Sequence, residues 1–283
     1  MRVSVLVDNR NNGQYSSEHG LSLLIEVDNF RLLFDTGQTG LFIDNARSMN
    51  VDLHDIDYVI LSHGHYDHVG GFKRFLEEYH FDKTVYVARS FLDKKYKKVD
   101  EEFVYNGITF PDDIYPFTFI GKEHQISKNI KLYGQVLGTN DFEEIQPRFY
   151  LKKDGFVKDM FMDELFLTVN TPKGLVVFGG CSHVGIVNII RHIENIAQKK
   201  VYAFVGGTHL SKANGERIAR TKEELKDVLL YSMHCSKESN YFTGSVIEFP
   251  DMMSNCGMEV MSNEKKAMYQ ALTDKDYKDG DKN

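Results

Sequence analysis

The residues with the most evident chemistry are three histidines and one aspartate in a six-residue stretch: His63, His65, Asp67 and His68. Neutral imidazole and carboxylate groups are donors that zinc, iron and manganese accept in proteins. Gly64 gives the backbone room to fold these donors together. The ordinary alternative is a solvated loop rich in histidine, but an H-x-H-x-D-H array is far denser than such loops provide. The array therefore predicts a metal centre with room for two ions, each with an open position for water or substrate.

Three further histidines each come shortly after an apolar run of the kind that forms a buried strand. They are His183 after residues 175–178, His209 after 201–205 and His234 after 228–233. A single histidine in a glycine-lined turn is more often a cap than a ligand. Since strand carboxyl ends in an α/β layer lie along one edge, we expect these three histidines to converge with the first cluster.

The segments around these residues alternate between strand and helix periodicity, which indicates an α/β fold. Residues 58–61 form a strand that runs directly into the first cluster. The last expected helix would begin with a Thr-x-x-Glu capping box, Thr221 with Glu224. The remaining expected elements are strands at 3–7, 21–27, 30–34, 84–88, 165–169, 175–178, 201–205 and 228–233, and helices at 41–48, 72–80, 186–198 and 221–228.

Regular patterning weakens between about residues 90 and 164, where lysines, aspartates and aromatic residues mix with short apolar runs. We interpret this segment as an insertion with its own helix and strands that forms a cap over the metal site. The expected organisation is a single domain over residues 1–261. A charged, mobile C-terminal tail is expected over residues 262–283.

Composition narrows the class of partner. The net charge of −7 argues against a protein that tracks nucleic-acid phosphates. No run of about 18 apolar residues is present, so no membrane span is expected. The three cysteines, Cys181, Cys235 and Cys256, lack the spacing of a disulfide framework, which favours reduced thiols and a cytoplasmic location. We therefore expect a small-molecule substrate, with no nucleic acid and no membrane as partner; the sequence predicts no oligomeric state.

The H-x-H-x-D-H array resembles the signature of the metallo-β-lactamase-fold superfamily. That resemblance implies an αββα sandwich of two mixed sheets flanked by helices, here with an inserted cap region. It also implies that one metal ion is held by His63, His65 and His183, and the other by Asp67, His68 and His234. Asp35, in an Asp-x-Gly motif, would support the loop that carries the H-x-H-x-D-H array from behind the ligands, although on sequence alone it could equally be a turn or cap residue.

One departure from the superfamily pattern concerns the ligand shared by the two ions. No aspartate ends a strand where the superfamily usually has its bridging aspartate, and Cys181 or His209 fills that place instead. Cys181 is also a candidate for a supporting role behind the ligands. One or two divalent ions are therefore expected, with zinc first and manganese, iron or magnesium as alternatives.

Several further motifs resemble one branch of the superfamily, whose members are similar to the archaeal dihydropterin–ribofuranosylaminobenzene phosphate synthase. These motifs lie at 18–22, 33–37, 180–188, 206–210 and 234–235. The resemblance implies a metal-dependent hydrolase or transferase for a phosphorylated or pterin-like small molecule.

Two mechanisms follow from this resemblance: attack by a metal-activated water, or departure of a metal-bound pyrophosphate. Asp67, His209 and His19 are the candidate catalytic residues, the two histidines for proton transfer or for binding an oxyanion. The alternative function is a non-hydrolytic, di-iron type redox or sensor protein.

Overall fold

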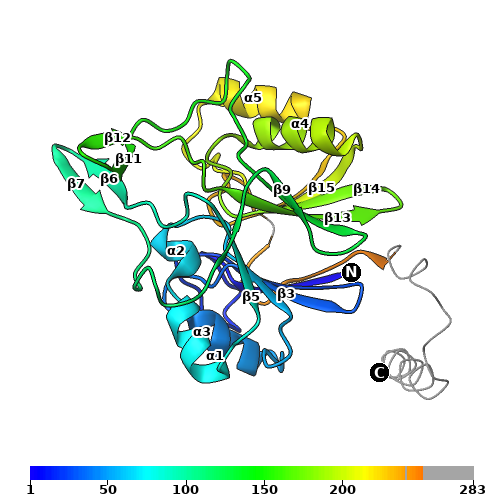
Figure 1. The fold of residues 1–283 in the computed structure, drawn as a ribbon. Coiled ribbons are helices and arrows are strands. Elements are labelled where there is room, and N and C mark those ends of the chain that lie inside the picture. Colours follow the sequence, from blue (N-terminus) through cyan, green and yellow to red (C-terminus); the bar gives the residue numbers. More distant parts are fainter. Residues whose placement is uncertain (240, 251–283) are drawn as a thin grey trace. The chain divides into compact units, whose positions relative to one another are not determined.

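Seven strands form the first sheet of the computed structural model, which describes residues 1–239 and 241–250 (Figure 1). Their order is β17 (Val246–Glu248), β1 (Arg2–Val7), β2 (Ser22–Val27), β3 (Phe30–Phe34), β4 (Tyr58–Ile60), β5 (Thr84–Ala88) and β8 (Thr118–Ile120). The β17, β1, β2 and β3 neighbours are antiparallel, whereas β3, β4, β5 and β8 run parallel. The sheet is therefore mixed, with the strand that leads into the histidine cluster among its parallel members.

Six strands form the second sheet. Their order is β16 (Leu229–Met233), β15 (Val201–Gly207), β14 (Gly174–Gly179), β13 (Leu165–Thr171), β10 (Ile130–Gly134) and β9 (Glu123–Gln125). Strands β14, β15 and β16 are parallel, with Gly179 opposite Gly206 and Gly207 opposite Met233. This register brings the carboxyl ends of the three strands to one edge of the sheet, as the sequence predicted.

Helices cover the outer face of each main sheet, on opposite sides of the pair (Figure 1). On the first sheet, α1 (Leu41–Ser48) and α3 (Phe72–Tyr79) bury Phe42, Phe72 and Phe75 in one core. On the second sheet, α4 (Ile186–Ala197) buries the isoleucines of its apolar face in another core, and α5 (Gly215–Glu224) lies beside it. The predicted αββα sandwich of two mixed sheets is confirmed, and Met1–Glu248 form one compact unit.

A third, four-stranded sheet has the order β12 (Phe156–Lys158), β11 (Phe149–Lys152), β6 (Lys95–Val99) and β7 (Glu102–Tyr105). The helix expected between residues 90 and 164 was wrong, because every regular element there is a strand and β8, β9 and β10 pair within the main sheets. Aromatic side chains meet across the strands of the third sheet; Tyr96 lies opposite Tyr105 on the neighbouring strand, with ring centroids 5.3 Å apart. Such cross-strand aromatic pairs stabilise a sheet.

The helix predicted at 221–228 was also wrong in its bounds, because the observed helix is α5, from Gly215 to Glu224. Its N-cap is Asn214, whose side chain accepts a hydrogen bond from the Arg217 backbone. Thr221 lies buried inside the helix and caps nothing. Asparagine is as good an N-cap as threonine, so the earlier start was available in the sequence. The tail predicted at 262–283 lies outside the described residues.

Candidate metal centre

The first histidine cluster occupies the metal loop, residues 62–71, which begins where β4 ends. His63 and His65 are buried, with His63 Nε2 3.1 Å from His65 Nδ1. The short helix α2 (Tyr66–Val69) follows at once and buries Asp67 and His68. A strand end followed by one helical turn thus packs four donors into a single buried loop.

The second sheet brings its donors to the same place. Cys181 and His183 follow β14, His209 follows β15 and His234 follows β16. Three of these four side chains are buried, and His209 is partly exposed. The rings of His63 and His183 have centroids 5.0 Å apart, and those of His68 and His234 are 4.8 Å apart. The structure therefore brings the histidines of the two sheets together.

His63, His65 and His183 form one group of imidazoles, with ring centroids 4.7–5.0 Å apart. Burial lowers the pKa of all three well below the ordinary value, so each ring is neutral at pH 7. The Nε2 atoms of His65 and His183 are buried without a hydrogen-bond partner. Neutral rings with unpaired buried nitrogens have lone pairs available for an ion.

Asp67, His68 and His234 form the second group. His68 Nε2 lies 3.2 Å from His234 Nε2, which is 3.4 Å from Asp67 Oδ2. Burial would raise the pKa of Asp67, but the neighbouring histidines hold it well below its usual range. Burial would likewise lower the pKa of His234, but Asp67 and Cys235 raise it to about 9. The carboxylate is therefore charged, as a metal ligand must be.

Asp35 and Ser62 hold the imidazoles of the metal loop from behind. Asp35 accepts hydrogen bonds from the Ser62 backbone, the Ser62 hydroxyl and His68 Nδ1, each at 2.7 Å. Because the Ser62 hydroxyl donates to Asp35, it accepts from His63 Nδ1 at 2.9 Å. These bonds place the ring protons of His63 and His68 on Nδ1 and leave both Nε2 lone pairs facing the centre. Asp35 is thus placed as expected, and Ser62 is a supporter that sequence reasoning missed.

Asp8 and Asn9 support the second group, and neither was predicted. Asp8 Oδ1 accepts from the His234 backbone at 2.5 Å, and Asn9 Oδ1 lies 2.8 Å from His234 Nδ1. The Asn9 amide also lies 3.1 Å from Nδ1 of His19. Both residues follow β1, so the only sequence signal for them is a position just after a strand end.

Glu164 supports His183, another contact that the sequence did not predict. Its carboxylate accepts from the backbone amides of His183 and Val184 at 2.7 and 3.1 Å. Burial raises the pKa of Glu164 to about 8. Next to it along the chain, Asp163 accepts from the Gly64 backbone at 2.8 Å, and Phe161 stacks on the His183 ring at 4.0 Å. The end of the 90–164 segment therefore braces both halves of the centre.

The two remaining candidates lie at the margin of the centre. His19 is half exposed, and its Nε2 lies 3.2 Å from Asp67 Oδ2. Burial of part of its ring lowers the pKa of His19 below the ordinary value for histidine. His209 has its ring 4.3 Å from that of His183, and neither of its nitrogens has a hydrogen-bond partner. The Cys235 thiol lies with His209 in a group whose donor atoms are within 4.8 Å of one another.

These donors fit divalent metal ions. Ligand nitrogens about 2.0–2.1 Å from a tetrahedral zinc lie about 3.3 Å from one another. Two close donor pairs match that spacing: His68 Nε2 and His234 Nε2 at 3.2 Å, and His234 Nε2 and Asp67 Oδ2 at 3.4 Å. The unpaired buried nitrogens and the ring protons held on Nδ1 point the same way. Among the described residues, donor groups such as His63, Cys181 and His183, or His68, Cys181 and His234, have ligand atoms within 4.8 Å of one another, whereas His65 is in none of these groups.

The backbone at the centre is held in an unusual conformation. Four residues that follow strand ends have positive φ although none is glycine: Asp35, Ser182, His209 and His234, at 53–59°. Such conformations cost on the order of 1 kcal/mol each and persist where surrounding bonds fix them. The Ser182 hydroxyl bond to Gly207 and the Asp8 bond to His234 are two such restraints.

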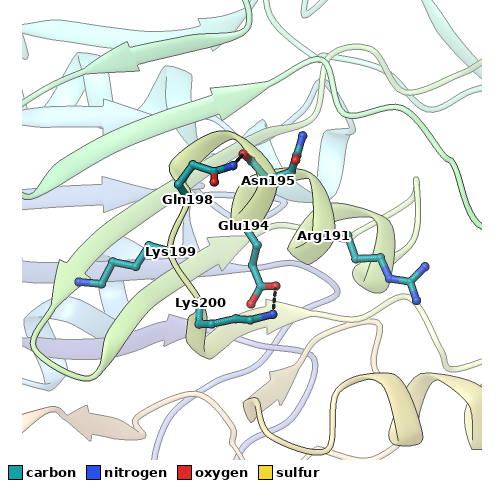
Figure 2. A pocket seen from close by; sticks show the side chains of 6 residues that line it. All are labelled: Arg191, Glu194, Asn195, Gln198, Lys199 and Lys200. Carbon is teal, nitrogen blue, oxygen red and sulfur yellow. Dashed lines mark hydrogen bonds and ion pairs between the residues drawn. The ribbon is translucent and has the colours of Figure 1, made fainter.

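A surface hollow elsewhere in the chain is lined by Arg191, Glu194, Asn195, Gln198, Lys199 and Lys200, on and just after the last turns of α4 (Figure 2). The Glu194 carboxylate is paired with Lys200 at 2.9 Å. None of the six is a candidate ligand, so this hollow does not mark the metal centre.

Comparison with known proteins agrees with this fold. Residues 18–133 match the model of the metallo-beta-lactamase superfamily. The solved structure of Tm1679, described as a metal-dependent hydrolase of the beta-lactamase superfamily, superposes with a TM-score of 0.74 at 31% identity, covering 88% of this chain and 99% of that one. This chain belongs to the metallo-β-lactamase superfamily, whose members generally bind divalent metal ions.

Within that superfamily the chain is related to two proteins of Methanocaldococcus jannaschii. The uncharacterized protein MJ0448 is 33% identical over 243 residues, which are 83% of this chain and 90% of that protein. The 7,8-dihydropterin-6-methyl-4-(beta-D-ribofuranosyl)-aminobenzene-5'-phosphate synthase is 31% identical over 256 residues, 82% of this chain and 86% of the synthase. The resemblance to the branch of the pterin-pathway synthase is thereby confirmed. Among the described residues, no helix is long and apolar enough to cross a membrane.

Proposed function

We propose that this chain is a metal-dependent hydrolase or transferase that acts on a small phosphorylated or pterin-like molecule in the cytoplasm. The observation that carries the proposal is the convergence of buried histidines from two sheets beside a charged carboxylate, in a relative of a pterin-pathway synthase. Neither a nucleic acid nor a membrane is proposed as a partner.

Each of two ions would be held by one of the two groups of side chains described above. One set is His63, His65 and His183, and the other is Asp67, His68 and His234. Divalent ions held there supply a Lewis acid for a phosphoryl or carbonyl oxygen and lower the pKa of water toward neutrality. The hydrogen bonds of Asp35 keep the His68 ring and the metal loop in one orientation.

Proton transfer falls to the two histidines at the margin. His209 has two unpaired ring nitrogens beside His183, so it can take a proton from a group bound there. His19 connects the Asp67 carboxylate to solvent, because its ring is half exposed and lies 3.2 Å from that carboxylate. Asn9 fixes the orientation of His19 through Nδ1.

An arginine near the centre suits a substrate with a phosphate group. The Arg148 guanidinium lies 4.9 Å over the Phe149 ring, which is 5.3 Å from the rings of both His65 and His183. The buried Nε of Arg148 has no hydrogen-bond partner. Arginine binds phosphate oxygens through its planar fork of N–H groups, so Arg148 is placed to bind a substrate anion.

Two reactions are compatible with this arrangement. In hydrolysis, a water oxygen bonds to phosphorus or a carbonyl carbon, and the leaving oxygen takes the bonding pair and a proton. In transfer, the amino nitrogen of the aminobenzene bonds to a pterin methylene carbon, the C–O bond to pyrophosphate breaks with its electron pair, and a proton of the amino group passes to His209. The synthase relative, whose name includes a dihydropterin and a ribofuranosyl-aminobenzene phosphate, favours transfer.

The test offers the zinc- or manganese-loaded protein both kinds of substrate. One assay uses aryl phosphate mono- and diesters with release of the phenol, and the other a dihydropterin-methyl pyrophosphate with an aminobenzene ribofuranosyl phosphate and release of pyrophosphate. We expect one reaction to be catalysed, and to be lost in His63→Ala. Full metal loading with neither reaction, together with visible absorption from iron in the protein as purified, would instead support the redox or sensor alternative.

A matched pair of arginine variants tests the anion contact. Arg148→Ala should raise KM for a phosphorylated substrate about tenfold, since a charge-assisted hydrogen bond contributes about 1.5 kcal/mol. Arg89→Ala serves as the control, because Arg89 is not among the residues that contact the centre. Equal KM changes in the two variants would remove Arg148 from the substrate site.

A further inference from the structure

Cys181 lies where the two groups of ligands meet. It lies two residues after the end of β14 and is 4% exposed. Its Sγ forms one group of donors with His63 and His183 and another with His68 and His234, each within 4.8 Å. The Sγ atom lies 3.2 Å from His68 Nε2. One sulfur atom therefore forms donor groups with proposed ligands of both ions.

None of the four carboxylates described near the centre, Asp8, Asp35, Asp67 and Glu164, lies between the two groups of ligands as the Cys181 thiol does. Asp35, Asp8 and Glu164 each accept two or more hydrogen bonds from the groups that they support. Asp67 groups with His19 and His234 and not with the His63 set. Among the described residues, Cys181 is thus the one side chain that forms a donor group both with His63 and His183 and with His68 and His234.

Two glycines allow Cys181 this position. A Cβ at Gly180 would lie 2.2 Å from the Ser62 hydroxyl oxygen, so glycine lets the end of β14 approach the metal loop. A Cβ at Gly207 would lie 2.7 Å from Cys235 Sγ and 3.4 Å from Cys181 Cα. Close backbone approach of this kind is a recurrent reason for glycine at a site.

Cys235 is the competing thiol. Its Sγ shares a donor group with Cys181 and His209, but that group includes neither His63 nor His68. It lies 3.5 Å from the Cys181 carbonyl oxygen, to which its thiol donates. Cys235 therefore borders the centre from one side, whereas Cys181 lies between its halves.

We infer that the Cys181 thiolate is a ligand shared by the two metal ions, and that the centre consequently selects thiophilic ions such as zinc over magnesium. The inference rests on the proposed metal-dependent function and names the bridging residue of that same site. Thiolate sulfur is a strong ligand for zinc, whereas magnesium and manganese prefer oxygen donors.

Cobalt substitution of the full-length chain tests the inference, because a thiolate bound to Co²⁺ gives an intense near-ultraviolet charge-transfer absorption that imidazole and carboxylate do not. We would titrate the metal-free wild type and Cys181→Ser, Cys181→Asp and Cys235→Ser with one and two equivalents of Co²⁺. Bound metal would be counted by elemental analysis, and folding would be checked by circular dichroism. The wild-type and Cys235→Ser absorption should grow with both equivalents.

The Cys181 variants should separate the outcomes. Cys181→Ser should lose the absorption and bind both ions at least tenfold more weakly. Cys181→Asp should bind two ions without the absorption, which keeps the test valid if the serine variant folds poorly. Absorption that survives in Cys181→Ser, or that disappears in Cys235→Ser alone, would overturn the inference while metal binding stands. A wild type that binds no metal would overturn the proposed function as well.

Discussion

The two main sheets supply the same centre in different ways. The first sheet contributes four donors from one loop, residues 62–71, at the end of the single strand β4. The second sheet contributes donors one strand at a time, from the ends of β14, β15 and β16. The first half of the centre is therefore local in sequence. The second half exists only when three parallel strands pair in register, so it depends on the whole fold.

The largest effect on activity is expected for His63, a ligand of the metal loop, and it can be compared with the effect of His209, a strand-end histidine placed for proton transfer. His63→Ala should lose bound metal and lower kcat/KM by more than 100-fold, because an ion loses one of its few ligands. His209→Ala should keep both ions and lower kcat about 10²–10⁴-fold, the usual range for a missing general acid or base. Elemental analysis and steady-state kinetics measure both.

Loss of one ion in His209→Ala would show that His209 is a metal ligand. The second sheet would then supply a ligand from the end of β15 as well as from β14 and β16. His234→Ala is the matched strand-end variant, and it should fall from two ions toward one. Unchanged metal content in His63→Ala would break the assignment of the metal loop.

The two parts of the centre, the metal loop and the strand-end residues, also differ in how well the sequence predicts them. The metal loop is evident because its donors lie within six residues, and the strands around it show the expected apolar patterns. The strand-end histidines are predictable only in outline, since the rule names an edge and not the distances along it. Cys181 could not be assigned from sequence, because its place between the two ligand groups is a product of the sheet register.

The supporting residues are harder still. Asn9 and Glu164 lie 225 and 19 residues from the histidines that they hold, in segments that read as a polar turn and as part of an insertion. Their signal is a polar residue adjacent to a strand end, which is common in any α/β chain. The strands expected in the 90–164 insertion could not be placed from sequence, because those of the third sheet are short, mix lysine with aromatic residues and lack a long apolar run.

The next largest effect, on stability, is expected for the buried ion pairs of Lys95 with Asp159 and Asp163, which connect the third sheet to the metal loop and are called the brace below. The buried Lys95 ammonium pairs with Asp159 at 2.9 Å and with Asp163 at 2.8 Å, and Asp163 holds the Gly64 backbone. Lys95→Met would leave two buried carboxylates without their cation, so we expect a loss of about 3–5 kcal/mol in the free energy of unfolding. Urea unfolding of the metal-free protein measures it.

The control for this brace is Lys97→Met, on the same strand and only partly buried. It should change the free energy of unfolding by less than about 0.5 kcal/mol. Similar losses in the two variants would mean that the third sheet is not anchored through Lys95. A Lys95→Met protein with unchanged zinc affinity would mean that the brace does not reach the metal loop.

A smaller effect compares the acids that support each half. Asp35→Asn removes the charge that holds the His68 ring and the Ser62 hydroxyl, so zinc affinity should fall about 10–100-fold. Asp8→Asn should cost less, because Asp8 holds the backbone of His234 and not its ring, which Asn9 still contacts. Competition with a chromophoric chelator measures both affinities. Equal losses would show that the two halves depend on their supporting acids alike.

The smallest effect is the pH dependence of Glu164, which supports the strand-end half. Burial raises its pKa from 4.5 to about 8, so in the metal-free protein the folded state binds a proton that the unfolded state has released between those values. Its contribution to stability is therefore present below pH 4.5 and is lost as the pH rises through 8. Chemical unfolding at pH 6.5 to 8 should show the free energy of unfolding fall by at most about 1.4 kcal/mol per pH unit because of this group.

Glu164→Gln isolates that contribution, because glutamine keeps one acceptor oxygen near the His183 amide and does not titrate. His234, whose pKa is raised to about 9, also destabilises the fold as the pH rises, but it does so equally in both proteins. The wild type should therefore lose stability relative to Glu164→Gln across this window. Parallel pH profiles would show that Glu164 is ionised throughout, so that the amides of His183 and Val184 stabilise a buried carboxylate and not a carboxylic acid.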